Sequence, residues 1–288
     1  MHELTLMTWN VRYFGQKTGG LLATRRCFTE IAAAIAKMTP LPDVLALQEV
    51  EDRSLRGGMG AIGQLDRFRR ALHHTLHQHG IDRRYRGLYY PAHRYSLPGT
   101  PPLYTTGLAM ILSEDITIEH SAAEEVTWVR IPVFTRFKQK RIVAHVRLSR
   151  GGGRLDLFNT HLSLPAFFEG SPHTVPRRMG HGSNQLEEIR QVIAMMSRRS
   201  EVLPTVVVGD FNSLPGSPVH QEMVAAGMED IYAEQGELCT ARFAHLRMHL
   251  DHIFATPSIQ WRQRSVLGEP FSRLSDHSPK VGTIRQPW

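Results

Sequence analysis

The stretch VVVGDFNSLPGSP, residues 206–218, joins three valines to Gly-Asp-Phe-Asn and then to a loop that contains two prolines. A short apolar run bounded by turn residues is typical of a buried β-strand. Such a strand would carry Asp210 and Asn212 at its tip. Rigid strands fix the geometry of polar groups at a sheet edge, so this stretch indicates a site as well as a sheet.

Similar apolar runs recur along the chain, at residues 4–11, 44–50, 107–113, 141–148, 154–162, 250–255 and 280–285. Three segments have the apolar spacing of amphipathic helices instead, residues 23–38, 63–80 and 183–200, the last with Ser183 or Asn184 as its N-cap. Strands therefore outnumber helices and alternate with them. This order favours an α/β arrangement with helices packed outside the sheets.

Two segments rich in proline, glycine and histidine, residues 87–104 and 163–185, are expected to form long loops beside strand ends. Loops of this length in a compact domain are usually functional or mobile.

The composition is that of an ordinary globular chain, since 41% of its 288 residues are hydrophobic and 21% are charged. We expect one domain over residues 1–288, because large β-rich enzymes often fill this length as a single unit. The formal net charge of +7 favours a polyanionic partner, such as nucleic acid or an anionic membrane surface.

The sequence shows no pattern of membrane insertion or secretion. No apolar run approaches the roughly 20 residues that cross a bilayer, and strand-like alternation begins too early for a signal peptide. Cys27 and Cys239 alone provide no disulfide framework. We expect a soluble cytoplasmic protein, and a monomer.

Acidic, amide and histidine side chains end several of the expected strands: Asn10, Glu49, Asp210, Asn212, Asp251, Asp276 and His277. Any one of them alone would be read as a turn or a helix cap. Together, carboxylates and amides without a cysteine cluster suit a hard cation, Mg²⁺ or Mn²⁺, and oxygen ligands leave Ca²⁺ open as well. Zinc is disfavoured.

The motifs TWN, LQE, NTHL, GDFN, the aspartate of LDHIF and SDH lie between residues 8 and 279. In order and approximate spacing they resemble the endonuclease/exonuclease/phosphatase superfamily, which includes deoxyribonuclease I, exonuclease III and neutral sphingomyelinases. The resemblance implies a four-layered αββα sandwich, with two mixed β-sheets face to face and helices outside. It also implies phosphoester hydrolysis with a divalent cation.

The resemblance further implies metal ligands and phosphate contacts. Glu49 would be the main metal carboxylate, with Asn10 and Asp276 completing or flanking the ion. Tyr104 and Arg141 stand where members of the superfamily contact the phosphate. The expected cofactor is Mg²⁺, with Mn²⁺ or Ca²⁺ as alternatives.

The catalytic groups follow from the same resemblance. Asp210 and Asn212 match the pair that orients the attacking water and binds the scissile phosphate. His277 matches a catalytic histidine, acting as general base or as a phosphate-binding cation, and Asp251 is its carboxylate partner. His161 resembles a second histidine that donates to the phosphate or to the leaving oxygen.

The N-terminal motifs are most like deoxyribonuclease I, and with the basic charge they favour a DNA nuclease. Two departures count against a close likeness: Glu51 stands where that enzyme has a groove-binding arginine, and Thr106 where it has a glutamate that supports the first histidine. Met248 replaces a tryptophan that is usual in abasic-site endonucleases.

Two other functions stay open. One is a sphingomyelinase-like or small-molecule phosphodiesterase or phosphatase, because the form GDFNSLPGSP is common in that branch and Phe167 and Phe168 lie in a loop that could touch a bilayer. The other is a non-catalytic binding protein, against which the intact set of catalytic residues argues.

Overall fold

Two six-stranded β-sheets dominate the fold of this protein. The computed structural model describes residues 3–56, 62–96, 99–128, 139–165, 177–236, 238–243 and 246–285. The first sheet contains, in spatial order, β13 (Trp261–Val266), β14 (Lys280–Arg285), β1 (Glu3–Asn10), β2 (Val44–Val50), β4 (Tyr104–Ser113) and β3 (Tyr85–Tyr95). The second contains β5 (Thr117–Glu125), β6 (Ile142–Arg150), β7 (Gly153–His161), β8 (Thr205–Asp210), β12 (Asp251–Ala255) and β9 (Glu229–Asp230).

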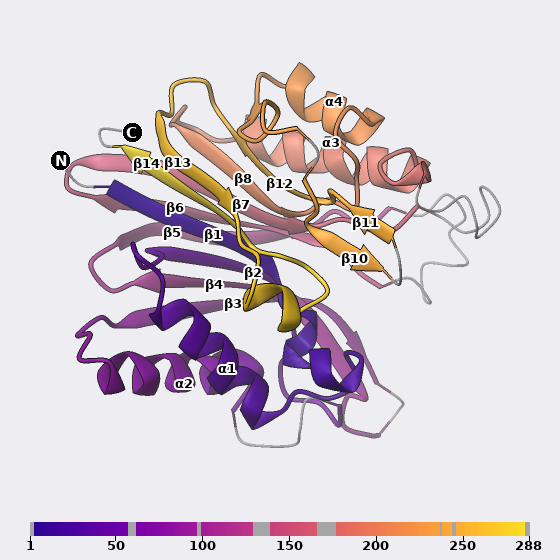
Figure 1. Ribbon diagram of the computed structural model, residues 1–288. Helices are drawn as coiled ribbons and strands as arrows, with labels where there is room; N and C mark the ends of the chain where they lie inside the picture. Colours follow the sequence, from indigo (N-terminus) through magenta and orange to yellow (C-terminus); the bar gives the residue numbers. More distant parts are fainter. Residues whose placement is uncertain are drawn as a thin grey trace.

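Helices cover the outer faces of the two sheets (Figure 1). The first sheet carries α1 (Arg25–Ala36) and α2 (Gln64–Gln78), and the second carries α3 (Ser183–Ser197) and α4 (Pro218–Ala225). Short 3₁₀ turns lie at η1 (Arg12–Phe14), η2 (Gln16–Thr18) and η6 (Phe271–Arg273), and β10 (Ala241–Phe243) pairs with β11 (Leu246–Met248) as a small hairpin. In the part of the chain that the structure describes, no helix is long and apolar enough to cross a membrane.

In the described residues the main hydrophobic core has three parts, one at each interface between the four layers, and a small fourth cluster lies beside the β10–β11 hairpin. The central part lies between the sheets and takes the inward-facing residues of β1, β2 and β4 from one side and of β6, β7 and β8 from the other. The second part packs the first sheet against α1 and α2, and the third packs the second sheet against α3 and α4. The expected αββα sandwich is therefore confirmed.

The eight apolar runs of the sequence correspond to β1, β2, β4, β6, β7, β8, β12 and β14. The three expected helices are α1, α2 and α3, and α2 stops at Gly80, whose φ of 69° only glycine adopts easily.

The loop expected at residues 87–104 is wrong for residues 87–95, because β3 occupies Tyr85–Tyr95, whereas residues 99–103 do lie outside any strand or helix. This strand lies at the edge of its sheet, a position that tolerates proline, and a bulge follows between Pro91 and His93. The proline that suggested a loop is thus an edge-strand residue. Of the loop expected at residues 163–185, residues 166–176, including Phe167 and Phe168, lie outside the described chain.

The expected N-cap of α3 is also wrong. The cap is Gly182, and Ser183 is the first helical residue. The Gln185 side chain closes this end instead, because its Oε1 accepts hydrogen bonds from the backbone N–H groups of Gly180 and Gly182 at 3.0 and 3.2 Å.

A buried ion cluster fastens β7 to its neighbours, five residues before His161. Asp156 is fully buried, and its carboxylate accepts from His145 Nε2 at 2.8 Å, Arg147 Nε at 2.9 Å and Arg199 Nη1 at 2.6 Å. Burial alone would raise the pKa of Asp156, but these three partners hold it far below its usual range. The charged carboxylate is therefore part of the folded state.

Asp156→Asn is expected to lower the free energy of unfolding by about 3–5 kcal/mol at pH 7, because it leaves buried cations without their anion. A carboxylate with a depressed pKa stabilises the fold above its unfolded value of about 4, and the contribution is lost as the pH falls below that value. Denaturant unfolding of wild type and variant at pH 7 and at lower pH measures this difference, which should shrink on acidification. Asp66→Asn, at an exposed pair with Arg69, is the control. Equal stability of wild type and Asp156→Asn at pH 7 would contradict the assignment.

Candidate active site

Strand ends bring the polar residues of the motifs to one edge of the sandwich. In the second sheet, Asp210 ends β8 directly opposite Asp251 of antiparallel β12 and His161 of parallel β7. In the first sheet, Asn10 ends β1 opposite Gln48 of parallel β2. Because parallel strands end at the same sheet edge and antiparallel ones begin there, residues far apart in sequence meet.

Gly209 explains how β8 carries Asp210 into this position. Its φ is 146°, and a Cβ placed on it would lie 1.9 Å from the carbonyl oxygen of Thr160 in β7. Only glycine allows the two strands to approach this closely. After Asp210 the chain turns through Asn212, whose φ is 47°, and the Asn212 amide Nδ2 donates to the Leu162 carbonyl at 2.9 Å.

The Asp210 carboxylate is the centre of the site. Its Oδ2 accepts a hydrogen bond from Asn10 Nδ2 at 3.0 Å and lies 3.5 Å from His161 Nε2 and 3.7 Å from His277 Nε2. Its Oδ1 accepts from the Asn212 N–H at 3.0 Å. Burial raises the pKa of Asp210 to about 7, and the Asp251 carboxylate adds to this rise, while His277 and Asn10 lower it. The carboxyl is suited to exchanging a proton near neutral pH.

His277 lies between two carboxylates. Its Nδ1 donates to Asp251 Oδ2 at 2.8 Å, and its backbone carbonyl accepts from Trp9 Nε1 at 2.8 Å. Burial lowers the pKa of His277, but Asp251 and Asp210 outweigh it and raise the value to about 10. The ligand atoms of Asp210, Asp251 and His277 lie within 4.8 Å of one another, so this group could hold a metal ion. The hydrogen bond to Asp251 and the raised pKa favour an imidazolium instead.

Glu49 projects from a bulge in β2. The pairing of β2 with β4 shifts by one residue between Leu47 and Val50, and Glu49 has a φ of 55°. A bulge of this kind turns a side chain away from the regular alternation. Burial raises the pKa of Glu49, and Asp276 raises it further, whereas His277 and Asn10 lower it.

These oxygen donors fit a hard divalent cation. The negative charge of Asp276 acts against the ionisation of Glu49, and the Asn10 amide stands beside Glu49. A divalent cation would relieve this repulsion, polarise a phosphoryl oxygen and stabilise the leaving oxygen. Arg12 Nη1 lies 3.2 Å from Asp276 Oδ2 and supplies positive charge at the same place.

Two buried amides join the sheets directly beneath the site. Gln48 Nε2 donates to Asn159 Oδ1 at 2.7 Å, and Asn159 Nδ2 donates to the Leu47 carbonyl at 3.2 Å. Gln48 precedes Glu49, and Asn159 is two residues before His161. These hydrogen bonds between the sheets therefore fix the position of Glu49 relative to His161.

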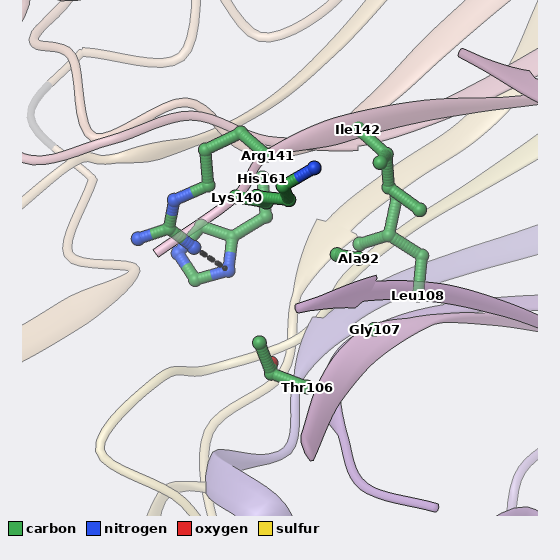
Figure 2. Close-up of a pocket in the computed structure, with 8 residues that line it drawn as sticks. All are labelled: Ala92, Thr106, Gly107, Leu108, Lys140, Arg141, Ile142 and His161. Carbon is green, nitrogen blue, oxygen red and sulfur yellow. Dashed lines mark hydrogen bonds between the residues drawn. The ribbon is translucent and has the colours of Figure 1, made fainter. Parts of the chain in front are cut away.

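His161 is oriented by Arg141 rather than by a carboxylate. Arg141 Nη1 lies 3.1 Å from His161 Nδ1, and Figure 2 shows the guanidinium beside the imidazole with Thr106 across from them. Since arginine only donates, Nδ1 must accept, and the ring proton is on Nε2, which faces Asp210. Burial and the charges of Arg141 and His277 keep the pKa of His161 well below its usual value. Thr106, Arg141 and His161 line a pocket of about 10 Å³, room for about one water.

Because the ring proton of His161 is on Nε2, two substitutions of this residue should differ in their effect on activity. Glutamine places an N–H donor near the position of Nε2, whereas asparagine places one near Nδ1. We expect His161→Gln to retain at least tenfold more kcat/KM than His161→Asn, which is the value of one hydrogen bond to a charged group. Steady-state kinetics on a cleaved substrate measures the ratio. Equal loss in the two variants would contradict an Nε2 donor.

Tyr104 and Glu51 both contact the Arg56 side chain rather than the Asp210 carboxylate. Tyr104 stacks on Tyr95, with centroids 5.6 Å apart, and faces the Arg56 guanidinium at 5.1 Å. Glu51 is buried and accepts from Ser54 Oγ at 2.7 Å and from Arg56 Nε at 3.2 Å. Glu51 thus holds Ser54 and Arg56 in place.

Sequence reasoning missed Arg12, Tyr13 and Arg56 as neighbours of the site. Arg12, Tyr13 and Phe14 are three successive non-glycine residues with positive φ, a conformation that costs about 1–2 kcal/mol per residue. The only signal in the sequence was their place directly after TWN.

A profile of the Endonuclease/Exonuclease/phosphatase family matches residues 7–277. The chain belongs to this family. Endonuclease/exonuclease/phosphatase proteins are hydrolases that act on phosphoester bonds and depend on divalent metal ions, so the chain is a phosphoesterase of this family. No curated protein matches the sequence closely enough to count as a relative.

Solved structures of the endonuclease/exonuclease/phosphatase family share the fold at low identity. A family protein from Leptotrichia buccalis is 18% identical with a TM-score of 0.71, over 98% of this chain and 99% of that one. The mannosyl-6-phosphatase of Bacteroides thetaiotaomicron is 18% identical with a TM-score of 0.65, over 98% and 99%. The human Nocturnin catalytic domain is 19% identical with a TM-score of 0.62, over 98% and 93%.

Proposed function

We propose that this protein is a Mg²⁺-dependent phosphodiesterase that cleaves nucleic acid, with DNA as its preferred substrate. The observation that carries the proposal is the meeting of Asp210, Asp251 and His277 beside Glu49 at one edge of the sandwich. A carboxylate, an imidazolium and an oxygen-rich cation site around one point are the groups that phosphoryl transfer to water requires.

Each group has a role in the proposed reaction. Glu49, Asn10 and Asp276 hold the cation, for which Mn²⁺ or Ca²⁺ are alternatives to Mg²⁺. Asp210 and Asn212 orient the attacking water, and Asp210 accepts its proton.

The histidines and the remaining contacts act on the phosphate. His277, held by Asp251, binds a phosphate oxygen as an imidazolium. His161 donates from Nε2 to the phosphate or the leaving oxygen, and Arg141 and Tyr104 line the phosphate-binding side.

Positive charge around the site supports a polyanionic substrate. Arg242 and Arg247 lie directly opposite each other on the β10–β11 hairpin, and the Arg242 N–H donates to the Asp276 carbonyl at 2.8 Å. Like charges across a strand pair are destabilising by themselves. A bound phosphate backbone would offset that repulsion, and the net charge of +7 acts in the same direction.

A smaller phosphoester is the second candidate, and the buried Glu51 favours it. Glu51 occupies the place of a groove-binding arginine and is committed to Ser54 and Arg56. Among the similar folds, one is named a mannosyl-6-phosphatase. A sugar phosphate, an inositol phosphate or sphingomyelin would then be the substrate.

A substrate panel with Mg²⁺ tests the two candidates. The panel holds supercoiled plasmid, single-stranded DNA, RNA, an abasic duplex, sphingomyelin, mannose 6-phosphate and bis-p-nitrophenyl phosphate, with Asp210→Ala as the blank. We expect DNA cleavage that weakens steeply with added salt, because binding releases counterions from the phosphates. Cleavage of a sugar phosphate or of sphingomyelin with none of DNA would establish the second candidate. Hydrolysis of no substrate, together with no divalent-ion binding by isothermal titration, would favour a non-catalytic binding protein.

A further inference from the structure

Tyr13 lies beside the site in a backbone conformation that ordinary residues avoid. Arg12, Tyr13 and Phe14 have φ values of 45°, 55° and 54°, one after another, and none of them is glycine. L-residues rarely adopt this left-handed region, because Cβ then crowds the following carbonyl. Such outliers persist only where the surroundings fix them, and they gather at functional sites.

The surroundings of this turn do fix it. On one side the Arg12 N–H donates to Asn10 Oδ1 at 3.0 Å, which ties the turn to the proposed metal site. On the other side the Phe14 ring packs between Phe28 and Phe68, at centroid distances of 4.8 and 5.0 Å. Between them the Tyr13 carbonyl accepts from Gln64 Nε2 at 3.2 Å.

The turn places the Tyr13 hydroxyl beside the segment that carries Arg141. Gln139 Nε2, two residues before Arg141, lies 3.5 Å from the Tyr13 hydroxyl. Burial and the Glu49 carboxylate raise the pKa of Tyr13, while Thr106 and Gln139 lower it, so the hydroxyl has Glu49 and Thr106 as neighbours. Thr106 also lines the pocket beside His161 (Figure 2).

Arg56 holds the ring of Tyr13 in place. Its guanidinium carbon lies 4.0 Å from the ring centroid, in cation–π geometry, and its Nε donates to the buried Glu51 carboxylate. The ring is therefore clamped by a side chain that is itself anchored. Because the ring is already fixed, the hydroxyl loses little conformational entropy when it binds a ligand, and its hydrogen bond contributes more fully to the binding free energy.

From this arrangement we propose that Tyr13 is a substrate-contacting residue whose hydroxyl donates a hydrogen bond to an oxygen of the phosphate bound between Glu49 and His161. The inference rests on the proposed phosphoester hydrolysis and adds a donor that none of the six motifs contains. The donor is uncharged, so it serves a phosphate monoester or diester alike.

Tyr13→Phe tests the proposal, because it removes the hydroxyl and keeps the ring under Arg56. We expect kcat/KM to fall about 10- to 100-fold, the value of one hydrogen bond to a charged group. Binding of inorganic phosphate in the presence of Mg²⁺, measured by isothermal titration, should weaken about tenfold or more by the same reasoning. Binding of Mg²⁺ alone should be unchanged.

Tyr90→Phe is the matched control, since it removes a hydroxyl that bonds Ser121 Oγ at 2.7 Å away from the site. It should behave as wild type in all three measurements. Wild-type phosphate affinity in Tyr13→Phe would overturn the proposal, and so would a loss of Mg²⁺ affinity, which would mean that the hydroxyl orients Glu49 instead. If the wild-type protein hydrolysed no substrate, only the proposed function would be contradicted. The phosphate affinity of Tyr13→Phe would still test the role of Tyr13.

Discussion

Replacing Asp210 by asparagine is expected to lower kcat about 10²- to 10⁴-fold, which is the contribution of a positioned general base. Asparagine has nearly the same shape and can still accept from Asn10, but it cannot take a proton from water. Its single oxygen can keep only one of the two hydrogen bonds that the carboxylate accepts, from Asn10 Nδ2 and from the Asn212 N–H. The lost hydrogen bond should cost about 1–3 kcal/mol of stability, and the larger effect should appear in kcat.

Single-turnover kinetics with saturating Mg²⁺ on the best substrate of the panel measures the effect, and thermal unfolding checks the fold. Asp115→Asn makes the same chemical change at an exposed carboxylate that pairs with Arg150 at 3.1 Å. It should leave kcat unchanged. Turnover of Asp210→Asn at the wild-type rate would show that Asp210 does not handle the proton.

Replacing Glu49 by glutamine is expected to weaken Mg²⁺ binding about 100- to 1000-fold. A unit charge at about 4 Å is worth about 4 kcal/mol at an effective dielectric constant of 20, and glutamine removes that charge while keeping an oxygen. Asp276 and Asn10 remain, so activity should return when the Mg²⁺ concentration is raised. The expected signature is a shifted metal requirement with much of kcat retained.

Isothermal titration with MgCl₂ measures the affinity directly, and a Mg²⁺ titration of activity measures the shift. Glu187→Gln, at a partly exposed carboxylate of α3, removes the same charge in the helix layer outside the second sheet. It should bind Mg²⁺ as wild type does. If Glu49→Gln kept wild-type affinity, the cation would be held elsewhere, with Asp210, Asp251 and His277 as the next group to test.

The strands that the sequence indicated are those with apolar residues on one or both faces. β8 and β2 are almost wholly buried, so their composition alone marks them as strands. β5 is mostly exposed, and β13 is largely polar, with partners on only one side. An edge strand is held by backbone hydrogen bonds to one neighbour, so its side chains need not show the apolar pattern from which a strand is predicted.

The motifs indicated which side chains gather, but the contacts among them came from the fold. That Arg141 would hold His161 Nδ1, and that Glu51 would turn inward to Arg56, depend on side-chain directions across separate strands. The position of Tyr13 could not be predicted from the sequence for a similar reason. Its left-handed turn is imposed by Phe14 in the core and Asn10 at the site, not by a local preference for that conformation.

The sequence by itself determined the layered α/β architecture, the family resemblance and the residue types that collect at strand ends, because strand burial and turn chemistry are local properties of a chain. Only the tertiary structure decided that Asp251 stands opposite Asp210, that His161 carries its proton on Nε2, and that the Tyr13 hydroxyl meets Gln139. Register and side-chain direction depend on contacts between residues far apart in the chain, such as Trp9 and His277, which are 268 residues apart. Such contacts exist only once the two sheets have packed.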